Sequence, residues 1–294
     1  MTGRIIKFYN SFFFVKISDK LMPCKLRGLM KRDKRSGSAV CPGDFVDISI
    51  LNDGTGIIES VQPRKNLLIR PAVANIDQVI LTFAAASPDL NRLLLNRFLV
   101  LAEWSKVKKI IICINKVDLI DDVENFLHEY EKLYKIIRVS TRTGDNIDLL
   151  KSQLRDCVTV LTGPSGVGKS SILNAIDPTF DLKIGHVSEK IQRGKHTTRV
   201  SELIDFANGF LVDTPGFSAI DLVDLGLDEK NLSTYFIEFD EFANKCKFSG
   251  CSHSHEPDCA IKSAVENEKI LKERYAAYLS MLNEINERKK LKYG

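Results

Sequence analysis

The sequence lacks long apolar runs and a signal peptide. None of its apolar stretches approaches the roughly 20 residues that a membrane-spanning helix needs. The first residues, Met1 to Arg4, lead directly into alternating residues, without the continuous apolar segment of a secretory signal. We therefore expect a cytoplasmic protein that has no membrane partner.

Cysteine is also sparse, and its distribution is uneven. Seven cysteines in 294 residues are too few for a disulfide framework. Four of them are scattered through expected strands and loops: Cys24, Cys41, Cys113 and Cys157. The other three cluster close to a histidine: Cys246, Cys251 and Cys259. This clustering points to a metal site in the last part of the chain.

The formal net charge is only +4, so the composition gives weak support for an anionic partner. The length, together with an apolar content of 44%, is enough for two or three domains with proper cores. We expect a multidomain protein with boundaries at residues 1–70, 71–225 and 226–294. We also expect it to be a monomer.

The first seventy residues predict a small β-barrel. The expected strands are short and separated by turn residues: 3–18, 23–30, 44–50 and 56–61. Strands of this number and length, with no helical period, match an OB-fold. Phe12, Phe13 and Phe14 offer a stacking platform for bases, although strand alternation places at least one of them in the core. The basic segment 31–38 is either a solvated loop or a contact for nucleic-acid phosphates.

A phosphate-binding loop is the strongest local pattern. It follows an apolar strand at 157–162 and precedes a helix that begins near Ser171. The loop matches G-x-x-x-x-G-K-[ST] at Gly163, Pro164, Ser165, Gly166, Val167, Gly168, Lys169 and Ser170. Lys169 is expected on the β- and γ-phosphates, the Ser170 hydroxyl on Mg²⁺, and Ser171 beside the nucleotide. An ordinary glycine-rich turn would not need this strand–loop–helix setting.

Strands and helices alternate from residue 76, which is typical of an α/β domain with a parallel sheet. We expect strands at 78–86, 109–114 and 135–139 and a helix at 90–104. The second strand ends in the motif N-K-x-D, formed by Asn115, Lys116, Val117 and Asp118. A carboxylate there accepts hydrogen bonds from N1–H and the 2-amino group of guanine, which adenine cannot supply. Ser140 and Thr141 begin a turn expected to touch the base from its other side.

Two further motifs follow the phosphate loop. The first is G-K-H-T-T-R at 194–199, in which one threonine ligates Mg²⁺; we prefer Thr198 to Thr197. The second is D-T-P-G, in which Asp213 holds Mg²⁺ through water and the Gly216 amide senses the γ-phosphate. GTP or GDP is therefore the expected ligand.

The order of these motifs is unusual for a GTPase, because the base-reading motif comes before the phosphate loop. Circular permutation explains the order without changing the site, since chain ends in compact domains often lie close together. As a consequence, the segment after Asp213 leads directly into the C-terminal domain. The nucleotide state can then act on that domain.

With these motifs in this order, the sequence resembles the RsgA (YjeQ) family of circularly permuted GTPases. The resemblance rests on GPSGVGKSS, GKHTTR and DTPGF and covers nearly the whole chain. It implies a slow intrinsic GTPase, stimulated by the small ribosomal subunit, that binds 16S rRNA and assists late maturation of that subunit.

Slow hydrolysis also follows from Phe217, which stands where many GTPases carry a glutamine that orients the attacking water. His196 is the nearest candidate for this role, and the resemblance points to it as well. The alternative is a loop histidine that only packs or faces solvent.

The C-terminal cluster reads Cys246-x4-Cys251-x-His253-x5-Cys259. Three thiols and one imidazole complete a tetrahedral structural Zn²⁺ site with no open position. His255 competes with His253, and the resemblance favours His253. One helix is expected at 264–290, packed on the zinc module or forming a short coiled-coil seam.

Two other functions compete with the GTPase. A nucleoside monophosphate kinase has a similar phosphate loop but no need for N-K-x-D, D-T-P-G or a zinc module. The other alternative is an RNA-binding module that is gated by the nucleotide and does not hydrolyse it. Phe217 is consistent with this alternative, because it stands in place of the glutamine that orients the attacking water.

Overall fold

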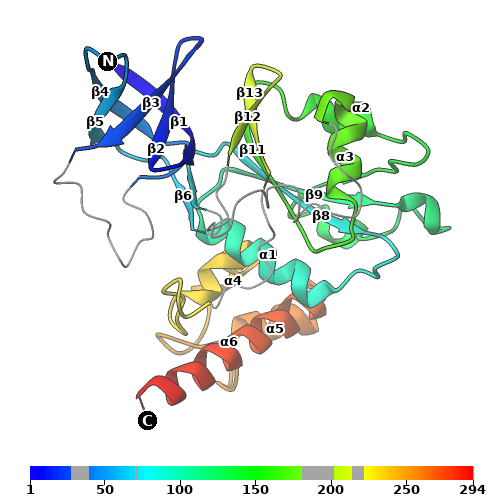
Figure 1. Cartoon of the computed structure of the whole chain (residues 1–294). Helices are drawn as coiled ribbons and strands as arrows, with labels where there is room; N and C mark the ends of the chain where they lie inside the picture. Colours follow the sequence, from blue (N-terminus) through cyan, green and yellow to red (C-terminus); the bar gives the residue numbers. More distant parts are fainter. Residues whose placement is uncertain (28–39, 70–71, 181–201, 214–221, 294) are drawn as a thin grey trace.

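The computed structural model describes residues 1–27, 40–69, 72–180, 202–213 and 222–293. Within these ranges the chain forms a barrel, a six-stranded sheet with helices on both faces, and a helical C-terminal lobe (Figure 1). This arrangement confirms the expected multidomain fold. None of the helices in the described ranges is long and apolar enough to cross a membrane.

The N-terminal barrel is closed by five strands in the order β1-β2-β3-β5-β4. Their bounds are β1 Thr2–Tyr9, β2 Phe12–Ile17, β3 Lys20–Leu26, β4 Phe45–Ile50 and β5 Gly56–Val61. The expected single strand at 3–18 is wrong, because Asn10 and Ser11 adopt positive φ and turn the chain between β1 and β2. Phe13 is buried in the barrel core, while Phe12 and Phe14 are only half-buried.

The central sheet has the order β10-β9-β8-β11-β13-β12, and every neighbouring pair except β12 with β13 is parallel. The strands are β8 Gln78–Ala84, β9 Lys109–Asn115, β10 Lys135–Arg138, β11 Val158–Thr162, β12 Leu203–Phe206 and β13 Gly209–Asp213. A hairpin of β6 Leu67–Ile69 and β7 Ala72–Ala74 precedes the sheet.

Alternate residues of the central strands face opposite layers of helices. Val79, Leu81 and Phe83 of β8 pack in one apolar cluster with α1 (Arg92–Trp104). Ile80 packs in a second cluster with α2 (Ile147–Ser152) and α3 (Lys169–Ile176). Burial on both faces explains why these strands read as continuous apolar runs in the sequence.

The C-terminal lobe consists of helices that share the apolar cluster of α1, and the last of them packs directly on α1. They are α4 Asp240–Ala243, α5 Ala260–Glu266 and α6 Lys272–Tyr293. The expected single helix at 264–290 is wrong, because Glu268 adopts positive φ and ends α5. The Lys269 amide then donates to the Ala264 carbonyl at 2.8 Å, which satisfies the end of the helix.

A buried arginine joins two segments of this lobe and also contacts the sheet domain. Arg274 of α6 is 0% exposed, and its guanidinium donates two hydrogen bonds to the Glu238 carboxylate, at 2.6 and 2.8 Å. A third bond reaches Asn96 of α1 at 3.2 Å. Burial lowers the pKa of Arg274, but the hydrogen bonds and charge of Glu238 outweigh it and raise the pKa overall. The ion pair is therefore fully formed inside the lobe.

We predict that Glu238→Gln lowers the free energy of unfolding by about 3–5 kcal/mol, because it leaves a buried guanidinium without its counter-charge. Glu229→Gln is the matched control, since Glu229 pairs with Lys289 in a partly exposed position and should lose less than about 1 kcal/mol. Urea titration followed by circular dichroism measures both. Equal losses in the two variants would contradict the assigned role of Arg274.

Candidate functional site

The predicted nucleotide motifs meet at one edge of the sheet. Strand β9 ends at Asn115, β11 at Thr162 and β13 at Asp213. These strands are parallel, and β8 lies between β9 and β11. Their carboxyl ends therefore lie at the same edge, which is where ligands bind in open α/β sheets.

The phosphate loop approaches its neighbours too closely for side chains at two glycines. A Cβ at Gly163 would collide with the Thr82 carbonyl, and one at Gly168 would collide with the Asn115 amide. Gly168 also has φ of +94°, which strongly favours glycine. Lys169, the first residue of α3, donates from Nζ to the carbonyls of Gly163 and Pro164, both at 2.7 Å. The ammonium thus lies at the loop, where a phosphate would bind.

Asn115 and Lys116 tie the base-reading motif to the phosphate loop. Asn115 donates from Nδ2 to the Val167 carbonyl at 2.9 Å. Lys116 donates from Nζ to the Gly166 carbonyl at 2.8 Å and to the Ser87 carbonyl. The two motifs are therefore braced against each other, although 48 positions separate Asn115 from Gly163.

Asp118 is held by the turn that follows β10. Ser140, which is fully buried, donates from its hydroxyl to Asp118 Oδ1 at 2.6 Å. The same hydroxyl accepts hydrogen bonds from the amides of Arg142 and Thr143. Arg142 Nη1 lies 3.8 Å from Asp118 Oδ2. The side chain of Asp118 is only 12% exposed, so the turn fixes the orientation of a largely buried carboxylate. The Thr141 amide contacts Asn115 Oδ1 at 3.4 Å, which joins the turn to the same network.

Ser170 fits a magnesium ligand. Its hydroxyl oxygen is buried and has no hydrogen-bond partner among the described residues. A buried polar group without a partner is costly unless something occupies its lone pairs. Hydroxyl oxygen is a ligand that Mg²⁺ accepts beside nucleotide phosphates.

Several predicted residues lie outside the described ranges. They are His196, Thr197, Thr198, Gly216 and Phe217. For Asp213 the structure describes the backbone alone, as the last residue of β13.

The sequence did not reveal the parts played by Ser87 and Arg142. Ser87 follows the C-terminal end of β8, at the same edge as the motifs, and supplies a carbonyl to Lys116. The rule that parallel strands end together at the ligand site could have indicated this residue. For Arg142, the proximity to Asp118 depends on how the turn folds, and no sequence motif marks it.

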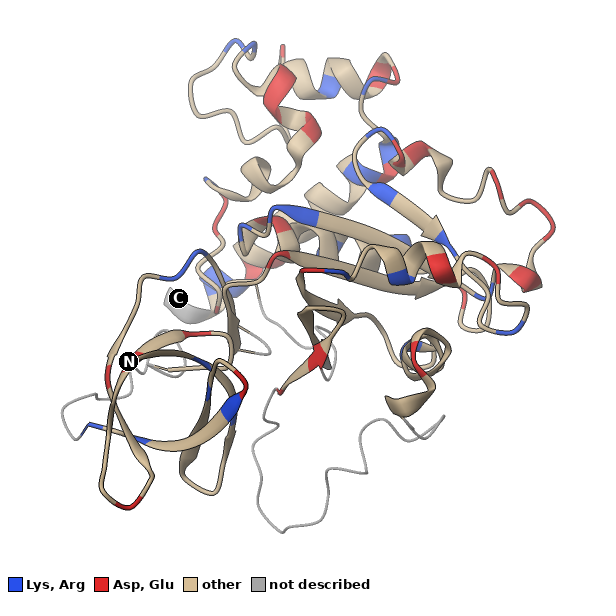
Figure 2. Cartoon of the chain, turned by 90° about the horizontal axis from the view of Figure 1, so that it is seen from above, with Lys and Arg blue, Asp and Glu red and all other residues tan. Residues whose placement is uncertain are grey.

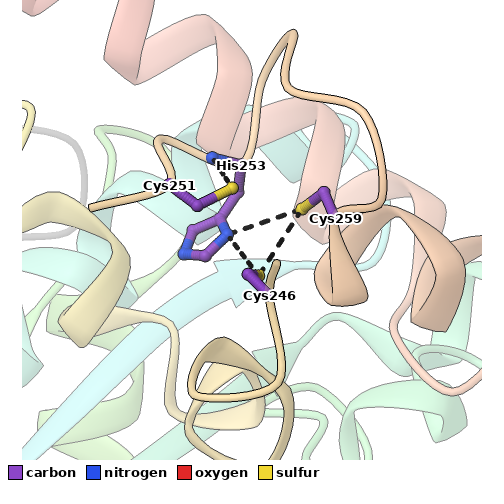
Figure 3. Close-up of side chains that lie close together, drawn as sticks. All are labelled: Cys246, Cys251, His253 and Cys259. Carbon is purple, nitrogen blue, oxygen red and sulfur yellow. Dashed lines mark hydrogen bonds between the residues drawn. The ribbon is translucent and has the colours of Figure 1, made fainter. Parts of the chain in front are cut away.

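A second candidate site lies in the C-terminal lobe. Cys246, Cys251, His253 and Cys259 place their ligand atoms within 4.8 Å of one another (Figure 3). His253 Nδ1 is 3.5 Å from Sγ of both Cys246 and Cys259, and these two sulfurs are 3.9 Å apart. Tetrahedral zinc, with Zn–S about 2.3 Å and Zn–N about 2.0 Å, puts ligand atoms about 3.5–3.8 Å apart. The cluster is therefore compatible with zinc.

Helix α6 holds the loop that carries this histidine. Tyr275 donates from its hydroxyl to the His253 carbonyl at 2.8 Å, and Tyr278 to the Ser252 carbonyl at 2.6 Å. His253 is buried, whereas His255 is exposed and contacts only the Ser254 hydroxyl among the bonds described for its ring. The geometry thus brings His253, and not His255, to the three thiols.

Comparison with known proteins identifies the family. The family profile described as RsgA GTPase matches residues 61–223, and that of the RsgA N-terminal domain matches residues 2–58. A relative from Clostridium botulinum, named small ribosomal subunit biogenesis GTPase RsgA, is 44% identical over 100% of both chains. Its namesake from Caldanaerobacter subterraneus is 41% identical over 99% of this chain and 98% of its own.

Two solved structures share the fold. The crystal structure of YjeQ from Thermotoga maritima matches with a TM-score of 0.81 and 36% identity, covering 97% of this chain and 98% of that one. YloQ, described as a circularly permuted GTPase, matches with a TM-score of 0.78 and 36% identity, over 98% and 95% of the two chains.

We predict that Asp118→Asn shifts base preference from guanine towards xanthine. The carboxylate would otherwise accept the two guanine donors, and a hydrogen bond to a charged group contributes about 1.5–3 kcal/mol. GTP affinity should therefore fall roughly 10- to 100-fold while XTP affinity rises. Competition against a fluorescent nucleotide measures both.

The exposed neighbour Asp121 provides the control for this prediction, because Asp121→Asn should leave both affinities as in the natural protein. Unchanged base selectivity in Asp118→Asn would contradict the assignment of this carboxylate to the base.

Proposed function

Because this chain belongs to the RsgA family of GTPases, we propose that it hydrolyses GTP to GDP and phosphate in order to assist late maturation of the small (30S) ribosomal subunit. The names of its relatives support that partner. The observation that carries the proposal is the joint placement of Asp118 and the phosphate loop at one edge of a permuted sheet. A barrel on one side and a cysteine–histidine lobe on the other complete the family architecture.

Each part of the nucleotide has its own residues in this proposal. Asp118 accepts from the guanine edge, Asn115 braces the loop, and the stem of Lys116 lies along the ring. Ser140 and Thr141 close the other side of the base, next to Val117. Amides of residues 163–168 and the Lys169 ammonium bind the phosphates, with Ser171 adjoining.

A bound magnesium ion would supply positive charge to the β- and γ-phosphates. Ser170 would hold this ion directly and Asp213 would hold it through water. Thr198, in preference to Thr197, would be a further ligand. The Gly216 amide senses the γ-phosphate. His196 places the attacking water in the absence of a glutamine at Phe217, so intrinsic hydrolysis is slow and contact with the subunit accelerates it.

The C-terminal lobe holds one structural zinc through Cys246, Cys251, His253 and Cys259. Four protein ligands leave no position for a substrate, so the ion stabilises the loop and has no part in the reaction. The barrel and this lobe contact 16S rRNA, and the protein acts as a monomer. The domain boundaries at residues 70 and 225 belong to the same proposal.

Charge alone does not locate the RNA contact. Lys and Arg residues are interspersed with Asp and Glu on the barrel, the sheet and the helices (Figure 2). The contact is therefore proposed from the family architecture, not from a single basic face.

We predict that purified small subunits raise the rate of GTP turnover about tenfold or more, because contact with the subunit would help to place the attacking water in a protein that has Phe217 where many GTPases have a glutamine. Phosphate release is measured with and without subunits, together with co-sedimentation in GDP and in a non-hydrolysable GTP analogue. No stimulation and no nucleotide-dependent co-sedimentation would contradict the partner. Phosphate transfer from GTP or ATP to GMP would instead support the kinase alternative.

We also predict that the protein contains one zinc per chain and that Cys259→Ser loses it, since a thiolate ligand is removed. Plasma mass spectrometry measures the metal, and thermal unfolding should show a lower midpoint for the variant. His253→Asn should likewise lose zinc, whereas His255→Asn should keep it. The opposite pattern in the two histidine variants would refute the ligand set.

A further inference from the structure

The barrel contacts the rest of the protein at two places of different character. The first is an apolar anchor beside the β6–β7 hairpin. Ile6 of β1 is buried in the same cluster as Leu68 and Val73. Next to it, Arg64 Nε donates to the fully buried carboxylate of Asp44 at 2.6 Å. Separating the barrel at this anchor would expose buried apolar side chains and disturb an ion pair whose carboxylate is fully buried. We therefore expect the anchor to stay in place.

The second place is polar and partly exposed. It lies between the barrel and the β12–β13 hairpin, which are neighbours in Figure 1. Lys7 pairs with Glu202 at 2.7 Å, and Lys16 pairs with Asp205. The acidic partners are 49% and 66% exposed. Exposed ion pairs are individually weak and screened by salt.

An aromatic ring completes this second contact. The guanidinium of Arg4 lies 5.2 Å from the ring centroid of Phe210, and the ammonium of Lys16 lies 5.3 Å from it. Both cations belong to the barrel, whereas Phe210 belongs to β13. A hollow of about 380 Å³ opens beside the contact, lined in part by Lys16 and Phe210. The interface is therefore made of charge and cation–π contacts and is incompletely filled.

The hairpin is also connected to the nucleotide motifs at both of its ends. Strand β12 begins at Leu203, four positions after the GKHTTR motif ends, and β13 ends on Asp213, the first residue of DTPG. Its turn, at Ala207 and Asn208, lies at the opposite edge of the sheet, where Ala207 accepts a hydrogen bond from the Asp156 amide. If the two nucleotide motifs move towards the nucleotide, the force on the hairpin therefore acts along its strands, from the turn towards the nucleotide edge of the sheet.

We propose that this second contact is a latch that GDP leaves closed and GTP opens, with the apolar anchor as the pivot of the barrel. The latch comprises Lys7 and Lys16 of the barrel with Asp205 and Phe210 of the hairpin and Glu202, which directly precedes it. Arg4 also donates to the Asn75 carbonyl at 2.9 Å and therefore stays with the anchor. The inference rests on the proposed function, in which Thr198 and Gly216 contact the γ-phosphate. Those contacts draw both ends of the hairpin towards the nucleotide and withdraw its charged side chains from the barrel.

Linkage gives the latch a measurable consequence. If GTP binding favours the open latch, then a mutation that favours the open latch must increase the affinity for GTP relative to GDP. The two effects are reciprocal, because they express the same coupling free energy. The ratio of the affinities for a GTP analogue and for GDP therefore reports the coupling. This measurement needs neither ribosomal subunits nor hydrolysis.

The test uses the full-length protein and Lys16→Glu, which places two carboxylates together at the latch. We expect the ratio of affinities, non-hydrolysable GTP analogue over GDP, to rise by about threefold or more, as weak ion pairs permit. Asp205→Lys should raise it similarly. Combining the two substitutions restores opposite charges and should return the ratio most of the way to that of the natural protein.

Lys20→Glu is the matched control, because it makes the same charge change on an exposed barrel lysine outside the latch. Its ratio should be unchanged. An unaltered ratio in both latch variants, or an equal change in Lys20→Glu, would overturn the latch. Failure of the natural protein to bind either nucleotide would overturn the proposed function instead, so the two failures are distinguishable.

Discussion

The nucleotide site depends on one geometric constraint, which is that parallel strands present their carboxyl ends at the same edge of a sheet. Asn115, Gly163 and Asp213 are far apart in the sequence, yet each follows or ends one of these neighbouring strands. The constraint concerns the spatial order of the strands and not their order along the chain. A permuted sequence can therefore form the same site, provided that the sheet order is kept.

The motifs were predictable from the sequence because the geometry of each depends on a few neighbouring residues, whose types that geometry restricts. Gly168 must have positive φ beside Asn115, and Lys169 must begin a helix, so the residue types at these positions are nearly fixed. The apolar strands were equally readable, because helices bury both of their faces. The cysteine–histidine cluster was readable for the same local reason, since its four ligands lie within fourteen residues.

Features that depend on long-range contacts were not predictable. Arg274 looks like an ordinary charged residue on a helix, but its burial requires Glu238 and Asn96 from two other segments. The break between α5 and α6 was hidden, because no glycine or proline marks it and the positive φ that ends the helix falls on Glu268, a residue type that is common in helices. The positive φ at Asn10 and Ser11 similarly divides a run that reads as one strand.

The two outer parts of the molecule are attached to the sheet domain in different ways, and this difference limits what each can do. The C-terminal lobe shares the apolar cluster of α1, and the buried Arg274, which is paired with Glu238 inside the lobe, donates a hydrogen bond to Asn96 of α1. Moving the lobe would expose the apolar cluster and break the hydrogen bond to Asn96, at a cost of several kcal/mol, so the lobe and the sheet domain form one body. The connection after Asp213 alone therefore cannot make the lobe respond separately to the nucleotide. Away from its anchor, the barrel contacts the β12–β13 hairpin through exposed ion pairs and the ring of Phe210, and these contacts cost less to break than the interface of the lobe. Of the two parts, the barrel is therefore the one whose position the proposed latch would let the γ-phosphate control.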